Sequence, residues 1–145
     1  MPIRCEIVSQ DRMVFQGDVD IVVLPGTDGE MGILPHHAPL LTTLRYGYIK
    51  VRVKDQEEVF TVAGGVAEVQ PNIVTVLADA AENVAEIDIE RAESARIRAE
   101  EALKTVHVDE IDRYLALEAA LRRSTLRLDA VKRYHTIQRK KYTNE

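Results

Sequence analysis

Four arginines in the second half of the chain have the spacing of an anion-binding site. Arg91 and Arg98 lie seven residues apart and Arg123 and Arg127 lie four apart, so each pair shares one face of a helix. If the two helices lie antiparallel, the two pairs meet. Guanidinium groups bind phosphate oxygens through forked hydrogen bonds, so the spacing predicts a phosphate cradle with no balancing acid.

The stretch IDIERA, residues 87–92, lies where the first of these helices would begin. Asp88 suits the N-cap, a role that contributes about 1 kcal/mol without any ligand. The free N–H groups of a helix N-terminus also attract phosphate. A purely structural interpretation stays open, because Arg91 can pair with Glu90, Glu93 or Asp88 for ~0.3–0.5 kcal/mol.

A second group of polar side chains lies between residues 24 and 44, where His36 and His37 follow Asp28 and Glu30. Zinc requires three or four converging ligands, and no third ligand appears at a recognisable spacing. The two carboxylates neighbour glycines in an expected exposed turn, where their pKa values stay ordinary. We therefore expect a pair of rigid turns that serves as a protein contact surface, rather than a metal or acid-base enzyme site.

The first 84 residues have a hydrophobic period of two, which is typical of strands. At least seven short segments rich in Val and Ile follow one another without an intervening helical pattern. Turns are expected between Val53 and Val59, at Gly64–Gly65 and at Gln70–Asn72. This half is predicted to be an all-β sandwich or barrel.

From about Asp88 the hydrophobic period becomes helical, so residues 85–145 are expected to form an antiparallel two-helix hairpin. Asp109 is the expected N-cap of the second helix. The seam of the first helix consists mostly of small residues, Ala92, Ala95, Ala99, Ala102 and Val106. A small-residue seam buries little area, at ~25 cal/mol per Å², so the hairpin must either lean on the β-half or open.

Composition bounds the class of protein. The chain has 145 residues, 46% hydrophobic and 30% charged, as expected for an ordered protein. No window approaches the ~18 apolar residues needed to cross a bilayer. The N-terminus lacks a signal-peptide core, so we expect a cytoplasmic protein. The lone cysteine, Cys5, is expected to be a buried thiol, and no phosphate-loop or hydrolase motif predicts an enzyme.

The net charge of −5 is unevenly distributed. Residues 1–84 carry 6 basic and 12 acidic side chains, whereas residues 85–145 carry 13 and 12. Residues 132–142 hold five basic side chains and no acid, so this tail is expected to contact an acidic protein or anionic lipid surface. The acidic remainder and the lack of a recognition motif argue against nucleic acid.

The stretches GEMGILPHHAPLLTTL and AGGVAEVQPNIVTVLAD closely resemble the epsilon subunit of F-type ATP synthases, called delta in mitochondria. The resemblance implies a non-catalytic subunit of the central stalk that couples rotation of the c-ring to ATP synthesis in the catalytic head. It also implies inhibition of ATP hydrolysis by movable C-terminal helices. The subunit would lie on the cytoplasmic face of a bacterial plasma membrane, held there only through the complex.

The resemblance also implies residue roles. The c-ring contact would be Asp28, Glu30 and Met31, and the contact with the gamma subunit would be Ser9, His37, Thr42 and Thr43. In an extended inhibitory state the helices would meet the alpha and beta subunits. Basic side chains would then approach an acidic segment of beta, with Arg122, Arg123, Lys132 and Arg133 as the candidates.

Some members of the family bind ATP through a motif [I/L]-D-x-x-R-A, matched here by Ile87, Asp88, Arg91 and Ala92. Matching family positions elsewhere are Glu82, Arg98, Arg123 and Arg127. ATP is thus expected as a regulatory ligand, and no cofactor is required. The alternative is a free-standing ATP-sensing module, which would not co-purify with gamma.

Overall fold

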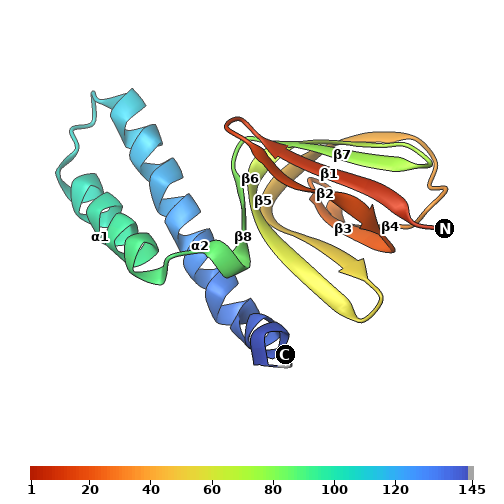
Figure 1. Ribbon diagram of the computed structural model, residues 1–145. Helices are drawn as coiled ribbons and strands as arrows, with labels where there is room; N and C mark the ends of the chain where they lie inside the picture. Colours follow the sequence, from red (N-terminus) through yellow and green to blue (C-terminus); the bar gives the residue numbers. More distant parts are fainter. Residues whose placement is uncertain (144–145) are drawn as a thin grey trace.

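The computed structural model describes the backbone of residues 1–143 and the side chains of residues 1–134. As Figure 1 shows, a β-sandwich is followed by two antiparallel helices, which confirms the predicted fold class. The described residues form eight strands: β1 Ile3–Ser9, β2 Met13–Val19, β3 Ile21–Gly26, β4 Gly29–Ile33, β5 Leu40–Val53, β6 Gln56–Val69, β7 Ile73–Ala78 and β8 Ala81–Asn83. The short helix η1, Val84–Glu86, leads to α1, Ile89–Thr105, and α2, Ile111–Thr143.

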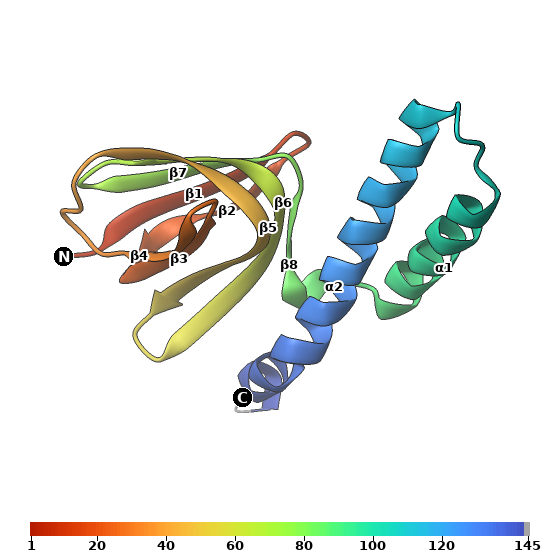
Figure 2. The ribbon, with the colours of Figure 1, turned by 180° about the vertical axis from the view of Figure 1, so that it is seen from behind.

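The strands belong to one sheet with the order β2-β1-β7-β6-β5-β3-β4, and β8 pairs with β6. The long strands β5 and β6 bend, so the sheet closes over itself in two layers (Figure 2). Alternate side chains of both layers meet in a core that includes Phe60, Ile7 and Leu24. Cys5 is part of this core, and burial raises the pKa of its thiol to about 12.

The turn predicted at Gly64–Gly65 is wrong, because β6 continues through both glycines. Their φ angles are +84° and +137°, values that bend the strand without ending it. Gly65 remains paired with Leu44 on one side and Ala78 on the other. The two glycines therefore mark the bend that lets β6 serve both layers.

The segment between residues 24 and 44 holds more regular structure than the two predicted turns. Its first turn joins β3 to β4, and its second, containing His36 with φ +67°, joins β4 to β5. Between the two turns, Met31 and Ile33 of β4 face the core. The alternation of apolar residues that is typical of a strand is short here and interrupted by glycines. The hairpin turn expected after Val53 is confirmed at Lys54–Asp55.

The helix start at Asp88 is confirmed, since the carboxylate accepts a hydrogen bond from the backbone N–H of Arg91 at 3.2 Å. The N-cap predicted at Asp109 is wrong. Asp109 lies in the turn between the helices, and the first hydrogen bond of α2 joins the Tyr114 N–H to the Glu110 carbonyl. Neither helix is long and apolar enough to cross a membrane over the residues that the structure describes.

The hairpin leans on the sandwich through a second, smaller core. Its buried members are Val59, Val84, Ile87, Ala130 and Tyr134. These residues come from β6, the η1 turn that precedes α1, and α2. The contact supplies the burial that the small-residue seam between the two helices cannot provide.

Candidate ligand cleft and docking interface

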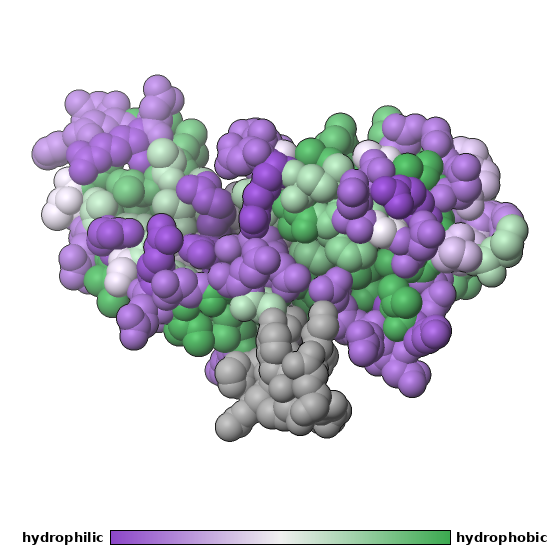
Figure 3. Space-filling view, in the orientation of Figure 1, coloured by the Kyte–Doolittle hydropathy of each residue, from purple (hydrophilic) through white to green (hydrophobic). Residues whose placement is uncertain are grey.

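A cleft of about 430 Å³ lies between the sandwich and the hairpin. Its sandwich wall comes from the β1–β2 turn, β6 and the segment 79–82, and its helical wall comes from Ala95 of α1 and several residues of α2. The polar side chains lining it are Ser9, Asp11, Arg12, Thr61, Asp79, Glu82, Arg123, Ser124 and Arg127. Figure 3 shows hydrophilic side chains gathered where the two halves meet.

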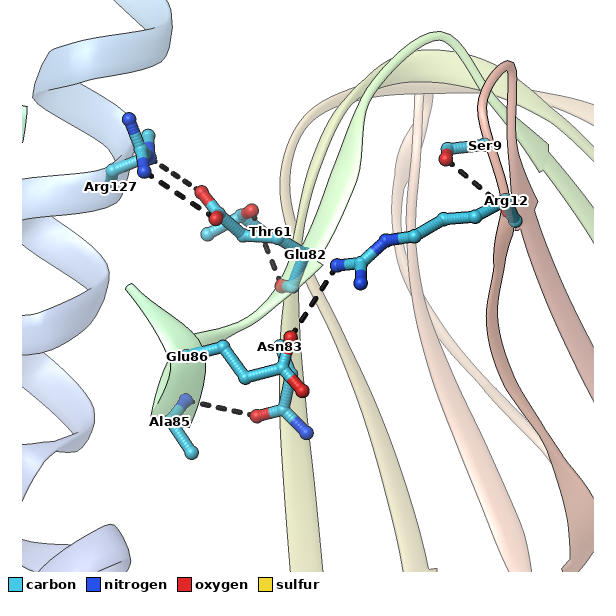
Figure 4. Close-up of polar contacts among 8 residues, drawn as sticks. All are labelled: Ser9, Arg12, Thr61, Glu82, Asn83, Ala85, Glu86 and Arg127. Atoms are coloured by element: carbon cyan, nitrogen blue, oxygen red, sulfur yellow. Dashed lines mark hydrogen bonds and ion pairs between the residues drawn. The ribbon is translucent and has the colours of Figure 1, made fainter. Parts of the chain in front are cut away.

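Arg127 is bound by Glu82 across this cleft. The Arg127 Nε and Nη2 atoms lie 2.5 and 3.5 Å from the two carboxylate oxygens of Glu82 (Figure 4). The backbone of Glu82 is held by the pairing of β8 with β6 and accepts a hydrogen bond from the Thr61 hydroxyl. The prediction of an arginine cluster without a balancing acid is therefore wrong for Arg127.

The other three arginines are all exposed. Arg123 lines the cleft and makes no hydrogen bond or ion pair with any side chain that the structure describes. Arg91 and Arg98 lie on α1 outside the residues that line the cleft. The structure thus brings Glu82, Arg123 and Arg127 together.

The remaining residues of the IDIERA stretch have structural positions. Ile87 belongs to the core beneath the hairpin, Asp88 caps α1, and Ala92 is fully buried. These positions support the structural interpretation of the three residues. Arg91 is exposed, as are the acidic residues Asp88 and Glu90 of the same stretch.

Two charged residues at this junction, Arg12 and Glu86, were not predicted from the sequence. The Arg12 guanidinium reaches from the β1–β2 turn to Glu86 of η1, with Nη2 3.4 Å from Oε2 (Figure 4). No helical spacing relates Arg12 to the other arginines, since strand pairing places it here. The only indication in the sequence was that Arg12 lies in the turn between two predicted strands.

A tyrosine clamp, consisting of Tyr46, Tyr48 and Tyr134, joins β5 to α2. Tyr48 and Tyr134 meet edge to face with centroids 5.2 Å apart. Each ring also carries a cation: Arg122 lies 4.1 Å from the centroid of Tyr46, Arg133 5.5 Å from Tyr48 and Lys50 5.6 Å from Tyr134.

The Tyr48 hydroxyl donates a hydrogen bond to the Asp129 carboxylate. Burial, and then this hydrogen bond, raise the pKa of Tyr48 well above its ordinary value, so the donor keeps its proton at neutral pH. Two of the four predicted inhibitory cations, Arg122 and Arg133, contact the sandwich in this arrangement. Lys132 is exposed, and the tail side chains from His135 onward lie outside the described residues.

The residues predicted to contact the c-ring lie at the β3–β4 hairpin. Asp28 and Glu30 are exposed there, whereas Met31 is half-buried against the core. Within the described side chains, no three His, Cys, Asp or Glu residues are grouped as a metal site. His37 instead forms a hydrogen bond of 2.7 Å between its Nδ1 and the Ala38 carbonyl.

Thr43, one of the four residues predicted to contact gamma, lies in an exposed apolar surface on the outer face of the sheet. The register aligns Thr43, Val66 and Leu77 in one row across three strands, with Val8 next to Leu77. We define the apolar strip as Met13, Leu41, Val66 and Leu77, of which Leu41 and Leu77 are 72% and 54% exposed. Thr42 precedes this row on β5, and Ser9 follows Val8 on β1.

Comparison with known proteins extends over both halves of the chain. Residues 2–84 match the family model for the β-sandwich domain of the ATP synthase delta/epsilon chain, and residues 85–132 match its long α-helix domain. An ATP synthase epsilon chain of Dehalococcoides mccartyi is 47% identical over 128 residues, 87% of this chain and 89% of that one. One from Halalkalibacterium halodurans is 41% identical over 131 residues, 90% of this chain and 98% of its own.

Two solved structures share the fold. A chain in the Euglena gracilis mitochondrial ATP synthase (OSCP, F1 and c-ring) is 23% identical, with a TM-score of 0.67 over 83% of this chain and 76% of that one. A chain in the central stalk and c-ring of Tetrahymena thermophila mitochondrial ATP synthase is 17% identical, with a TM-score of 0.57 over 88% and 93%. At these identities the likeness concerns the fold.

Proposed function

Because the chain belongs to the family of ATP synthase delta/epsilon subunits, we propose that it is a non-catalytic epsilon subunit in the central stalk of an F-type ATP synthase. The observation that carries this proposal is the match of both family domains, in order, over residues 2–132. The subunit would couple c-ring rotation to ATP synthesis, as a peripheral part of the complex on the cytoplasmic face of a bacterial plasma membrane.

The apolar strip supports a protein partner on the outer face of the sheet. Exposed apolar side chains gathered on one face of a sheet mark an interaction surface, and Thr43 lies in the row that contains Val66 and Leu77 of this one. We assign the strip to the gamma subunit. The exposed carboxylates of Asp28 and Glu30, on a separate hairpin, are assigned to the c-ring.

Inhibition of ATP hydrolysis would require the hairpin to leave the sandwich. In the docked arrangement Arg122 and Arg133 lie on tyrosine rings of the clamp, and an acidic partner would have to draw them away from these rings. Opening would release these cations toward the alpha and beta subunits. The docked hairpin is therefore assigned to the non-inhibiting state.

Deleting residues 132–145 is expected to raise the rate of ATP hydrolysis by the assembled enzyme. The deletion removes Tyr134 and so frees the hairpin, but it also removes five basic side chains, and the open hairpin then lacks these cations for an acidic surface. The rate is measured on enzyme reconstituted with the truncated or the full-length subunit. A Lys104→Ala variant, altered at an exposed basic side chain of α1, is the control. An unchanged rate after truncation contradicts the role of the tail, and elution of the full-length chain without gamma favours the free-standing sensor.

We also assign ATP to the cleft as a regulatory ligand. The cleft has a volume within the range usual for small-molecule sites, and Arg123 and Arg127 project into it from one face of α2. Arg91 and Arg98 would approach the phosphates only with side-chain rearrangement, since neither lines the cleft. Glu82 would hold Arg127 in place beside the ligand.

Isothermal titration of the full chain with MgATP tests this site. Heat of binding is expected for the native chain, and Arg123→Ala is expected to weaken the affinity about tenfold through loss of a charge-assisted hydrogen bond. Arg91→Ala measures the contribution of the exposed arginine, and the double variant combines both. Absence of heat at millimolar ATP, or heat unchanged in the double variant, refutes the site.

A further inference from the structure

The β1–β2 turn places a cation on the wall of the cleft opposite the helices. Arg12 lines the cleft together with Ser9 and Asp11, and its side chain extends toward the η1 turn (Figure 4). Its guanidinium has one polar partner among the described side chains, Glu86, at 3.4 Å. Both side chains are more than half exposed, 56% and 60%, and an ion pair of this kind is weak and readily exchanged.

The three arginines of the cleft differ in their availability to a ligand. Arg127 is held by Glu82 through a forked contact between two half-buried side chains. Arg123 has no polar partner among the described side chains, and Arg12 has only the exposed Glu86. An anion entering the cleft therefore meets one available guanidinium from the sandwich and one from α2.

We propose that Arg12 is a further binding residue of this cleft, one that contacts the phosphates of a bound nucleoside triphosphate from the sandwich side. The proposal rests on the proposed ATP site and extends it to the N-terminal half of the chain. Forked guanidinium donors on two walls of a cleft suit a chain of phosphates, which offers oxygens on several sides.

The position of Arg12 would strengthen the regulatory role proposed above for the ligand. Arg12 moves with the sandwich and Arg123 moves with the hairpin, so a ligand held by both binds only when the two halves are docked. Such a ligand stabilises the docked arrangement by its differential affinity for it. The Glu82–Arg127 pair already joins the two halves at this site, and Arg12 adds a direct contact between the sandwich and the ligand.

A competing interpretation treats Arg12–Glu86 as a structural strap between the sandwich and the linker to α1. The two interpretations make different predictions for Glu86. If the pair is a strap, removing either charge has the same effect on docking and hence on the ligand. If Arg12 binds the ligand, Glu86 is its competitor, and removing Glu86 leaves the affinity unchanged or raises it.

The test compares Arg12→Gln, Glu86→Gln and Arg4→Gln by isothermal titration of the full chain with MgATP. Arg12→Gln is expected to weaken binding about tenfold, the effect of one charge-assisted hydrogen bond. Glu86→Gln is expected to bind as tightly as the native chain or more tightly. Arg4→Gln, which removes an exposed β1 cation paired with Glu6 outside the cleft, is expected to leave the affinity unchanged.

The proposal is overturned if Arg12→Gln binds like the native chain, or if Arg12→Gln and Glu86→Gln weaken binding equally. Absence of binding by the native chain removes the ATP site itself, and the inference with it. Heat with the native chain and no change in Arg12→Gln removes the inference alone. Thermal unfolding in the absence of ATP verifies that each variant, altered at an exposed side chain, retains its fold.

Discussion

Replacing Tyr134 by Ala is expected to release the hairpin from the sandwich. Tyr134 is 7% exposed, belongs to the core beneath α2 and meets Tyr48 edge to face. Truncating a buried aromatic side chain costs about 3–5 kcal/mol. Because the docking core is small, most of that loss falls on the docking equilibrium, and the ratio of docked to open hairpin falls roughly a thousandfold.

Amide hydrogen exchange measures this release. Tyr134→Ala is expected to lose protection along α2 from about Ala120 to Ala130, whereas the amides of β1 and β7 in the main core stay protected. Under the proposed function, enzyme reconstituted with this variant also hydrolyses ATP more slowly than enzyme with the native chain.

Tyr114→Ala is the matched control, since this tyrosine of the same helix is 43% exposed near the tip of the hairpin. It is expected to leave the exchange of residues 120–130 unchanged. Tyr48→Phe gives an intermediate result, because it removes the hydrogen bond to Asp129 but keeps the ring. Full protection of α2 in Tyr134→Ala would contradict the assignment of docking to this core.

The sequence predicts the type of each half better than the limits of its elements. Alternating apolar residues and a helical seam suffice for a sandwich and a hairpin, because one buried face imposes one period. Glycine has no side chain to bury, so its positions show no such hydrophobic period. Gly64–Gly65 has the composition of a turn, and only its pairing with β5 and β7 makes it a bend. Asp109 fails as a cap for a similar reason, since the turn continues to Glu110 before α2 begins.

For the candidate site, too, the sequence predicts features within one helix but not contacts between the two halves of the chain. Spacing along one helix correctly places Arg123 and Arg127 on a common face, and helix-capping chemistry identifies Asp88. Contacts between the sandwich and the hairpin cannot be predicted from residue spacing, because they depend on which face of the sheet packs against α2. Arg12 is one example, and the pairing of Glu82 with Arg127 is another.

The tyrosine clamp also depends on contacts between the two halves, but it leaves a partial signal in the sequence. Tyr46 and Tyr48 lie two residues apart and hence on one face of β5. Two aromatic side chains on one face predict that the face is covered. Their spacing carries no information about the helix that covers them.

Gly65→Ala is expected to destabilise the sandwich by about 4 kcal/mol. An added Cβ would lie 2.3 Å from the Leu77 carbonyl oxygen and 2.8 Å from the Ala78 Cα, both backbone atoms of β7. A φ of +137° is strained for any residue with a Cβ, at about 1–3 kcal/mol, and overpacking adds a similar amount. Urea unfolding followed by far-ultraviolet circular dichroism gives the free energy of unfolding, which is usually about 5–15 kcal/mol in total.

Gly17→Ala on β2 provides the control for this substitution. Its added Cβ would meet the Phe15 ring at an ordinary 3.5 Å and its φ is not positive, so a change within about 1 kcal/mol is expected. A turn at the surface would relax around a new methyl group, whereas a bend paired on both sides must separate β6 from β7. A loss as small as that of Gly17→Ala would therefore place Gly65 in a relaxed turn. A large loss of stability would show that the bend at Gly64–Gly65 is held between its neighbouring strands. This bend directly precedes Val66, which pairs with Leu77 in the apolar strip.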